Sequence, residues 1–392
     1  SAHMVSGEVV ELQDVIIIGA GIMGCCTAYH AAQRGLKPLV LEQFTAGHTK
    51  GSSHGKSRII RYAHTNATYI PIMIESFEHW EDLEDLSGMQ LINKCGVLWI
   101  ADPMTTKRNS KLLNDYEVDH EVLIGSEIQR AFPQVRYNEQ WYALVDREGG
   151  ILHADRCLKA AQEEAVKNGA EFHFGEKVMQ IKSATDGVIV VTDKTTYAAK
   201  KLVVTAGGWL NKILPDFDDI IETQAEQVPT SYWTITKNHD AYKLENCPVI
   251  VVEENDDLMY MTPPVEHHNQ VKFLIHNESE PIDPDRQAKK LFFTNRLLPY
   301  HISEHFPDID CSKPSTIDSC MYTTTDDSHC VVGCYPSDPR IIIGGGFSGN
   351  GFKFAPVIGR MLTELAQGAD ESAIVPELFR FERGMTTSFR AF

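Results

Sequence analysis

The first forty residues alternate between short apolar runs and one helical stretch, in the order strand, helix, strand. Residues 15–18 are four consecutive β-branched side chains, a pattern typical of a strand buried on both faces of a parallel sheet. Residues 25–34 then predict a helix, which Gly35 can end. A second apolar run, residues 38–41, closes on Glu42. The pattern predicts a β-α-β unit at the start of the chain.

The middle of the chain continues this alternation of helices and strands. Residues 69–86 predict a long amphipathic helix whose buried face carries Ile72, Phe77, Trp80 and Leu83. Further helices are predicted at residues 125–132 and 154–169, strands at residues 95–101, 171–174 and 187–192, and a strand that runs into glycines at residues 202–209.

The sequence pattern changes at residues 226–315, where short runs alternate between apolar and polar residues, as is typical of an antiparallel sheet. This predicts a second, sheet-based domain folded over the first. The C-terminal part returns to strands and then to a helix at residues 355–367, with Pro356 in its first turn, where a helix start permits proline. The predicted elements of these two parts are strands at 231–235, 249–252, 258–262, 271–276, 319–326 and 340–343, and a mostly helical segment at 287–305.

Three glycines follow the first strand in G-x-G-x-x-G spacing. Gly19 makes the tight turn, Gly21 lets the backbone approach a pyrophosphate, and Gly24 lets the helix pack on the strand. The helix N-terminus then faces the phosphates, and Glu42 can accept hydrogen bonds from a ribose diol. The alternative to a dinucleotide-binding motif is an ordinary glycine-rich turn. However, strand, glycines, helix, strand and acid all occur in the order that the motif requires. The motif favours an ADP-bearing dinucleotide and leaves FAD and NAD open.

Composition and charge narrow the function classes. The chain has 392 residues, enough for two domains, and its formal net charge of −18 argues against nucleic acid and anionic membranes as partners. A local cationic pocket for a small anion remains compatible with that charge. The nine cysteines have no paired metal spacing, which favours free thiols in a reducing compartment.

Two pairs of basic residues have both a functional and an ordinary interpretation. Arg58 and Arg61 would project from one side of a helix or tight turn, although a solvated loop is the default for two isolated arginines. Lys272 and His276 lie at even spacing on a predicted strand and therefore on one face. The two side chains could meet a substrate or flavin if that face lines a cavity. The pattern alone favours the alternative, in which they are ordinary surface residues.

Four segments resemble the monomeric sarcosine oxidase family of flavoprotein amine oxidases: residues 19–24 (GAGIMG), 51–61 (GSSHGKSRIIR), 319–325 (SCMYTTT) and 346–353 (GFSGNGFK). The resemblance implies an α/β (α+β) fold of the glutathione-reductase or D-amino-acid-oxidase type, with a discontinuous Rossmann-like FAD-binding domain and a second antiparallel-sheet substrate domain. The FAD-binding domain is expected at residues 10–90, 150–225 and 316–392, and the substrate domain at residues 91–149 and 226–315.

The resemblance also implies roles for individual side chains. Cys320 corresponds to the cysteine that binds the flavin covalently through its sulfur, and Lys272 to the basic residue that promotes electron transfer to oxygen. A fixed cation there would stabilise developing negative charge. Arg61 and Lys353 correspond to the pair that holds the substrate carboxylate, the arginine as a two-point fork and the lysine as a point charge.

Further positions complete the site that the resemblance implies. Arg58 corresponds to a cation beside the flavin ring, and His276 and Tyr322 to positions near the substrate amine. Tyr260 corresponds to a pocket tyrosine, although the loop after it differs from the family's pattern. Asn350 stands where close relatives have histidine, which bears on the substrate's size and identity. The expected FAD-binding residues are Gly19, Gly21, Ile22, Met23, Gly24, Glu42, Gln43, Ser52, Ser53, His54, Ser57, Arg58, Val178, Ala206, Gly207, Trp209, Cys320, Met321, Gly346, Phe347, Ser348, Gly349, Gly351 and Lys353.

The implied reaction is FAD-dependent oxidation of the C–N bond of a secondary or cyclic α-amino acid, such as sarcosine or L-pipecolate, with O2 reduced to H2O2. Two alternatives stay open: a flavin dehydrogenase that passes electrons to a protein or quinone, and a non-catalytic FAD-binding protein. The expected partners are the small-molecule substrate and O2, with no nucleic acid, no membrane and no metal. The expected state is a monomer in peroxisomes or the cytoplasm, although residues 390–392 are not a peroxisomal tripeptide.

Overall fold

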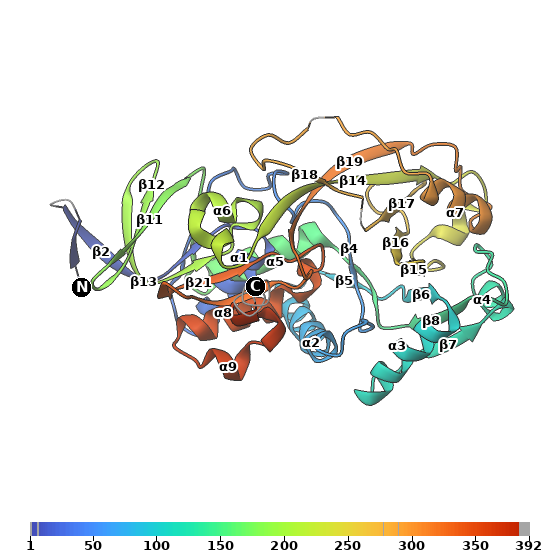
Figure 1. The fold of residues 1–392 in the computed structure, drawn as a ribbon, viewed down its shortest axis with the longest axis horizontal. Helices are drawn as coiled ribbons and strands as arrows, with labels where there is room; N and C mark the ends of the chain where they lie inside the picture. Colours follow the sequence, from blue (N-terminus) through green and yellow to red (C-terminus); the bar gives the residue numbers. More distant parts are fainter. Residues whose placement is uncertain (1, 6–7, 277, 289, 384–392) are drawn as a thin grey trace, which may run out of the picture.

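The structure is a computed structural model that describes residues 2–5, 8–276, 278–288 and 290–383, so residues 390–392 lie outside the described part. Within it, the strands form two nine-stranded sheets and one three-stranded sheet. The first large sheet and most of the helices occupy one half of the molecule, and the second sheet occupies the other (Figure 1). The predicted mixed α/β architecture is confirmed.

The first sheet has a parallel centre built from the predicted β-α-β unit. β2 (Glu8–Ile18) pairs in parallel with β3 (Leu39–Glu42) on one side and with β13 (Thr196–Val204) on the other. Because residues 15–18 are buried on both faces, their unbroken apolar run is the expected sequence for this position. The remaining strands are β1 (Ala2–Val5), β10 (Glu171–Phe174), β11 (Val178–Ala184), β12 (Gly187–Thr192), β20 (Val331–Tyr335) and β21 (Asp338–Gly345).

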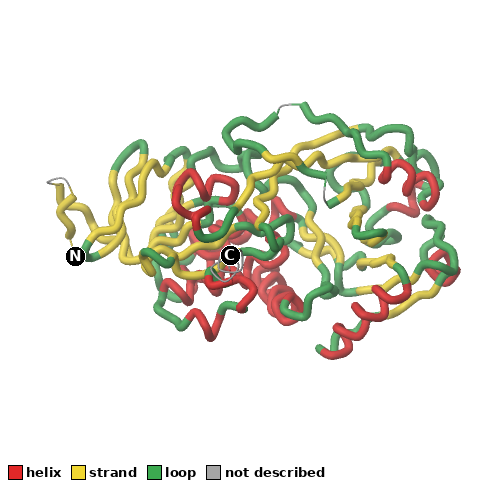
Figure 2. The backbone as a smooth tube through the Cα atoms, in the orientation of Figure 1, coloured by secondary structure: helices red, strands yellow, loops and turns green. Residues whose placement is uncertain are grey.

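Four helices share one hydrophobic core beside this sheet: α1 (Ile22–Gln33), α2 (Tyr69–Ser87), α5 (Ala154–Lys167) and α8 (Gly351–Ala366). In Figure 2 these helices gather in the half of the molecule that holds the first sheet. The predicted buried face of α2 is confirmed, since its four apolar residues all belong to this core. They are Ile72, Phe77, Trp80 and Leu83.

The second sheet is mainly antiparallel, as its alternating sequence predicts. β19 (Thr316–Thr325) pairs with β14 (Thr223–Thr234) over ten residues, and the two strands lie side by side in Figure 1. The sequence assigned residues 316–325 to the FAD-binding domain, whereas this pairing joins them to the second sheet; the full domain division stays a prediction. The other strands are β6 (Val97–Ala101), β7 (Glu121–Ile124), β8 (Tyr142–Asp146), β15 (Val249–Glu254), β16 (Asp257–Thr262), β17 (Gln270–Ile275) and β18 (Glu280–Pro281).

A small sheet of β4 (Arg58–Ile60), β5 (Ile92–Asn93) and β9 (Gly150–Leu152) lies between the two halves (Figure 1). The segment with the two arginines is therefore a strand and not the helix or turn considered from sequence. Arg58 is the first residue of this strand and Arg61 follows its last residue, and the two side chains contact different aromatic rings. Arg58 lies over the ring of Phe352, and Arg61 lies over that of Trp99.

Two predicted helices differ from the structure. In the predicted helix 287–305, helix occurs only in α7 (Leu297–His305) among the described residues, and the Asn295 side chain accepts the N–H of Leu298 where this helix begins. The last long helix starts at Gly351, four residues earlier than predicted, so Pro356 lies inside the helix and not in its first turn. The helix starts within a glycine-rich segment, which the sequence pattern assigned to a turn. The remaining helices are α3 (Pro103–Asp115), α4 (Ser126–Ala131), α6 (Leu210–Ile213) and α9 (Glu371–Ile374).

The described residues contain no helix that is long and apolar enough to cross a membrane. They also contain no group of three His, Cys, Asp or Glu side chains that could hold a metal ion. The nine cysteines are free thiols, five of them buried.

Candidate active site

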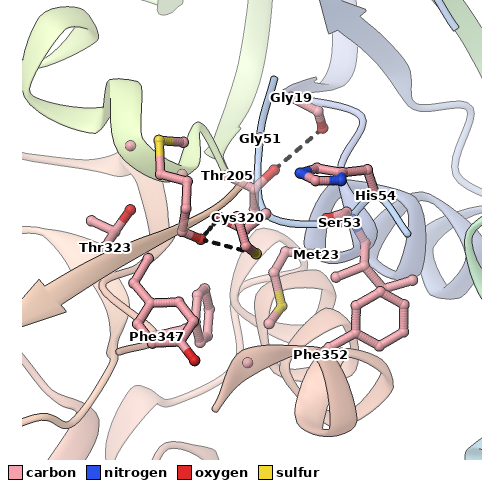
Figure 3. Close-up of a pocket in the computed structure, with 18 of the residues that line it drawn as sticks. Gly19, Met23, Gly51, Ser53, His54, Thr205, Cys320, Thr323, Phe347 and Phe352 are labelled. Atoms are coloured by element: carbon pink, nitrogen blue, oxygen red, sulfur yellow. Dashed lines mark hydrogen bonds between the residues drawn. The ribbon is translucent and has the colours of Figure 1, made fainter. Parts of the chain in front are cut away.

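The turn after β2 shows why the first glycine of the motif is required. Gly19 has φ +95°, which an L side chain rarely adopts, and a Cβ there would overlap the carbonyl oxygen of Thr205. The Thr205 hydroxyl donates to the carbonyl of Ile18 at 2.8 Å and to that of Gly19 at 3.4 Å, which ties the turn to the end of β13; Figure 3 shows the bond to Gly19. Gly24 has a different role, because a Cβ there would overlap the Gly19 carbonyl and push α1 off the strand.

Two helix N-termini open into one cavity. α1 begins after Gly21 and α8 begins after Asn350, and neither of these two residues caps its helix with its own side chain; the first N–H of α1, that of Ile22, donates to Ser53 Oγ at 3.0 Å. The first residues of both helices line a cavity of about 520 Å³. Backbone N–H groups and the positive ends of two helix dipoles therefore face the same space, an arrangement that suits a phosphate-bearing ligand.

Glu42 lies at the tip of β3 with a buried carboxylate. It accepts the backbone N–H groups of Ala20 at 2.9 Å and Phe44 at 3.1 Å, and His48 lies 3.5 Å away. Burial alone would raise the pKa of Glu42, but the hydrogen bonds from His48 and the two N–H groups outweigh it and lower the pKa. An ionised acceptor at this strand tip fits a ribose diol. His48 was not predicted, because its contact with Glu42 arises only in the folded loop.

The cavity brings together nearly every side chain that the sequence resemblance selected. Gly24 is the exception, because it packs helix on strand and does not line the cavity. The predicted residues that line it are Gly19, Gly21, Ile22, Met23, Glu42, Gln43, Ser52, Ser53, His54, Ser57, Arg58, Arg61, Val178, Ala206, Gly207, Trp209, Tyr260, Lys272, His276, Cys320, Met321, Tyr322, Gly346, Phe347, Ser348, Gly349, Asn350, Gly351 and Lys353.

Cys320 lies on β19 and lines the middle of this cavity, near Met23, Phe347 and Phe352 (Figure 3). It is opposite Val228 of the neighbouring strand β14. Its sulfur makes only a long contact of 3.9 Å with the carbonyl oxygen of Met321, and the side chain is half-buried. The thiol is therefore accessible from the cavity.

Arg61 and Lys353 are two buried basic side chains that line the same cavity. They are 4% and 7% exposed, and Lys353 Nζ donates to the Asn350 side chain at 3.1 Å. One Arg61 nitrogen, Nη1, is buried with no hydrogen-bond partner among the described residues. Burial and the nearby Arg61 charge lower the pKa of Lys353 far below its usual value. Because burial and the Arg61 charge both disfavour the charged form of Lys353, an anion bound beside the two side chains would stabilise that form.

His276, Tyr260 and Tyr322 form an aromatic wall next to the two cations. The His276 ring centroid lies 5.9 Å from that of Tyr260 and 5.7 Å from that of Tyr322. Burial, followed by the charges of Lys353 and Arg61, lowers the pKa of His276 to about 4. The imidazole is therefore neutral at physiological pH and can accept a hydrogen bond from a bound amine.

Lys272 and His276 lie on the face of β17 that lines the cavity, so the surface interpretation of this strand is wrong. Lys272 Nζ donates to Ser57 Oγ at 2.7 Å and to Glu266 Oε1 at 2.9 Å. Glu266 was not predicted as part of the site. It lies in the loop after β16, and no local pattern indicates that this loop reaches Lys272 and Ser57.

A glycine-rich strand–helix turn, two helix N-termini and an ionised carboxylate on one cavity define a dinucleotide-binding fold. The FAD dependent oxidoreductase family matches residues 14–365. The chain belongs to this family, and FAD is its cofactor.

Individual relatives narrow the class of enzyme that the chain resembles. A Caenorhabditis elegans relative whose name contains the words sarcosine oxidase is 36% identical over 361 residues, covering 91% of this chain and 94% of the relative. Peroxisomal sarcosine oxidase of Mus musculus is 34% identical over 390 residues, covering 96% and 98%. The structure of L-proline dehydrogenase from P. horikoshii has the same fold, with a TM-score of 0.80, 21% identity and coverage of 96% of this chain and 99% of that chain.

Proposed function

We propose that this protein is a flavoprotein oxidase of secondary or cyclic α-amino acids, converting the C–N bond to an imine and O2 to H2O2. The observation that carries the proposal is the buried pair Arg61 and Lys353 at one end of the FAD cavity. This pair suits a carboxylate, and relatives of the whole chain are named sarcosine oxidases.

The cavity residues fit FAD along its length. Glu42 suits the ribose of the adenosine, and the N-terminus of α1 suits the pyrophosphate. Glycine at position 349 lets the loop before α8 pack against His276 and Tyr322, since a Cβ there would come within 2.9 Å of both side chains. When bound there, FAD accepts two electrons from the substrate and passes them to oxygen.

The protein's own contribution is to orient the substrate and keep its amine neutral. Arg61 and Lys353 would fix the carboxylate, which places the reacting C–H bond by a two-point contact. The neighbouring positive charge disfavours a protonated amine, and the neutral His276 ring can accept a hydrogen bond from the amine N–H. Asn350 holds Lys353 and so bears on the size of substrate that the pocket accepts.

Covalent attachment of FAD through Cys320 is part of the proposal. Its support is the accessible thiol on the cavity wall and the matching segment 319–325. We expect acid-denatured wild-type protein to retain its yellow colour after filtration, and the Cys320→Ser variant to release all of it. The variant Cys334→Ser, which changes a half-buried cysteine that does not line this cavity, should retain colour like the wild type. Colour found only in the wild-type filtrate would refute the linkage.

Anaerobic mixing tests the reaction independently of the electron acceptor. We expect sarcosine, pipecolate or another secondary α-amino acid to bleach the flavin absorbance of the purified protein. Absence of bleaching by every secondary amino acid would contradict the proposed substrate class and favour a non-catalytic FAD-binding protein. Bleaching that oxygen then fails to reverse would favour a dehydrogenase with another acceptor.

The remaining proposals concern location and assembly. Mammalian relatives are named peroxisomal, which supports peroxisomes, with the cytoplasm as the alternative. A Streptomyces avermitilis relative, 30% identical over 380 residues, is named monomeric sarcosine oxidase, which supports a monomer.

A further inference from the structure

Glu266 and Lys272 form a buried ion pair to which the proposed reaction assigns no role. Their side chains are only 10% and 12% exposed, and Nζ lies 2.9 Å from Oε1. Lys272 comes from β17, whereas Glu266 comes from the loop between β16 and β17. The loop thus folds back to place a carboxylate beside the lysine that faces the FAD cavity.

Ser57 closes this pair into a triangle of hydrogen bonds. The Lys272 ammonium donates to Ser57 Oγ at 2.7 Å, and the Ser57 hydroxyl donates to Glu266 Oε1 at 2.6 Å. The ammonium also reaches the Ser57 carbonyl at 3.4 Å. Glu266 Oε2 is buried with no hydrogen-bond partner among the described residues, so the carboxylate's contacts are made through Oε1. Three hydrogen bonds thus fix the position of the Lys272 ammonium.

The electrostatics of the pair are asymmetric. Burial lowers the pKa of Lys272, Glu266 opposes that effect, and Arg58 adds to it. Burial would raise the pKa of Glu266, but Lys272 and Ser57 lower it, so the carboxylate is ionised. The other titratable or charged groups that act on the pair are Arg58, Cys320, Tyr232 and His153, and beyond Tyr232 lie Asp318 and His267.

We propose that Glu266 is a positioning residue that keeps Lys272 protonated and fixed beside FAD, so that the reaction of the reduced enzyme with oxygen depends on Glu266 across physiological pH. The inference rests on the proposed function in so far as oxygen is the acceptor. A buried lysine next to Arg58 and without a carboxylate partner would lose its proton more readily. Glu266 therefore controls the charge that Lys272 presents to the cavity.

A purely structural role would give a different result on substitution. Glutamine retains the size of Glu266 and can accept the Ser57 hydroxyl, so it preserves the tie between the loop and β4. Only the charge is lost. An effect of Glu266→Gln that varies with pH and disappears when Lys272 is also changed would therefore report the charge on Lys272 and not the fold.

The test uses FAD-bound enzyme reduced chemically with dithionite, so it does not depend on the amino-acid substrate. Reoxidation by O2 and the flavin midpoint potential are measured from pH 6 to 10. For Glu266→Gln we expect the oxygen rate to fall with rising pH at a midpoint about 1 pH unit or more below that of the wild type. Below that midpoint its flavin potential should be more positive than that of the wild type, because a negative charge near the flavin is gone.

Three variants serve as controls. Glu266→Asp keeps the charge and should resemble the wild type. Lys272→Arg combined with Glu266→Gln should abolish the pH step, because a guanidinium stays charged without a carboxylate partner. Glu226→Gln removes another partly buried carboxylate, which bonds Thr324 and Ser279 and not Lys272, and should show no step.

Equal pH profiles for Glu266→Gln and wild type would overturn the proposal while leaving amino-acid oxidation intact. If Glu266→Gln does not retain FAD, Glu266→Ala replaces it with the same expected step. Loss of FAD from both would also overturn the proposal, since Glu266 would then be a structural residue. A failure of the proposed substrate class would instead appear as absence of bleaching by amino acids, with the dithionite measurements unaffected.

Discussion

Replacing Lys272 by methionine is expected to slow the reaction of reduced flavin with oxygen by about two to three orders of magnitude, the usual cost of removing one preorganised charge-stabilising group. Methionine keeps the approximate length and the apolar stem but removes the cation that lines the cavity. Anaerobic reduction by substrate should change far less. Stopped-flow measurement of the two half-reactions separates these effects.

The control for this variant is the double substitution Lys272→Met with Glu266→Gln. The single variant leaves the Glu266 carboxylate buried without its ion partner, which is costly by itself. The double variant removes both charges, so a slow oxygen reaction in both proteins assigns the effect to the lost cation. Equal losses in the oxidative and reductive half-reactions would show that Lys272 serves the substrate or the fold instead.

Removing the Arg61 guanidinium should weaken binding of acid substrates at least about tenfold. Truncating one partner of a buried charge-assisted pair costs about 2–5 kcal/mol, and each 1.4 kcal/mol is a factor of ten. Arg61 is buried and has an unpartnered Nη1, so a bound carboxylate supplies contacts that the protein itself lacks. Arg61→Ala should raise the Kd, and Arg61→Lys should restore only part of the affinity because the planar fork is lost.

The comparison that decides this role is an amino acid against its amide. Wild type should strongly prefer the acid, and Arg61→Ala should lose most of that preference. Simple carboxylates should compete with substrate and perturb the flavin spectrum in the wild type, and less so in the variant. The matched control is Arg58→Ala, which removes a cavity cation that lies over Phe352 and should retain the preference. An unchanged preference in Arg61→Ala would place the carboxylate site elsewhere.

Local patterns predicted most of the fold. The unbroken apolar run at residues 15–18 and the amphipathic period of α2 depend on which side of one element is buried, and both predictions agree with the structure. Two helix predictions failed where a local signal misled. Glycines before α8 concealed the start of that helix, and apolar residues in 287–296 suggested a helix that begins only at Leu297.

The site was less accessible to sequence reasoning, because its contacts join segments far apart in the chain. Even spacing put Lys272 and His276 on one face, but only the packing of the loop before β4 and of α8 makes that face a cavity wall. Glu266 is separated from Ser57 by 209 residues, and their hydrogen bond follows no sequence period. The cavity residues were predicted from the resemblance of their motifs to a known family. The ion pair between Lys272 and Glu266 could be found only in the structure.

The most direct test of the central claim is a screen of the purified yellow protein in air against sarcosine, pipecolate, proline and larger N-alkyl amino acids, with hydrogen peroxide and substrate consumed measured together. The account predicts that at least one secondary α-amino acid is consumed with one peroxide formed per molecule oxidised. Its amide should react poorly. Failure of every secondary amino acid, or turnover with an artificial electron acceptor and no peroxide, would contradict it.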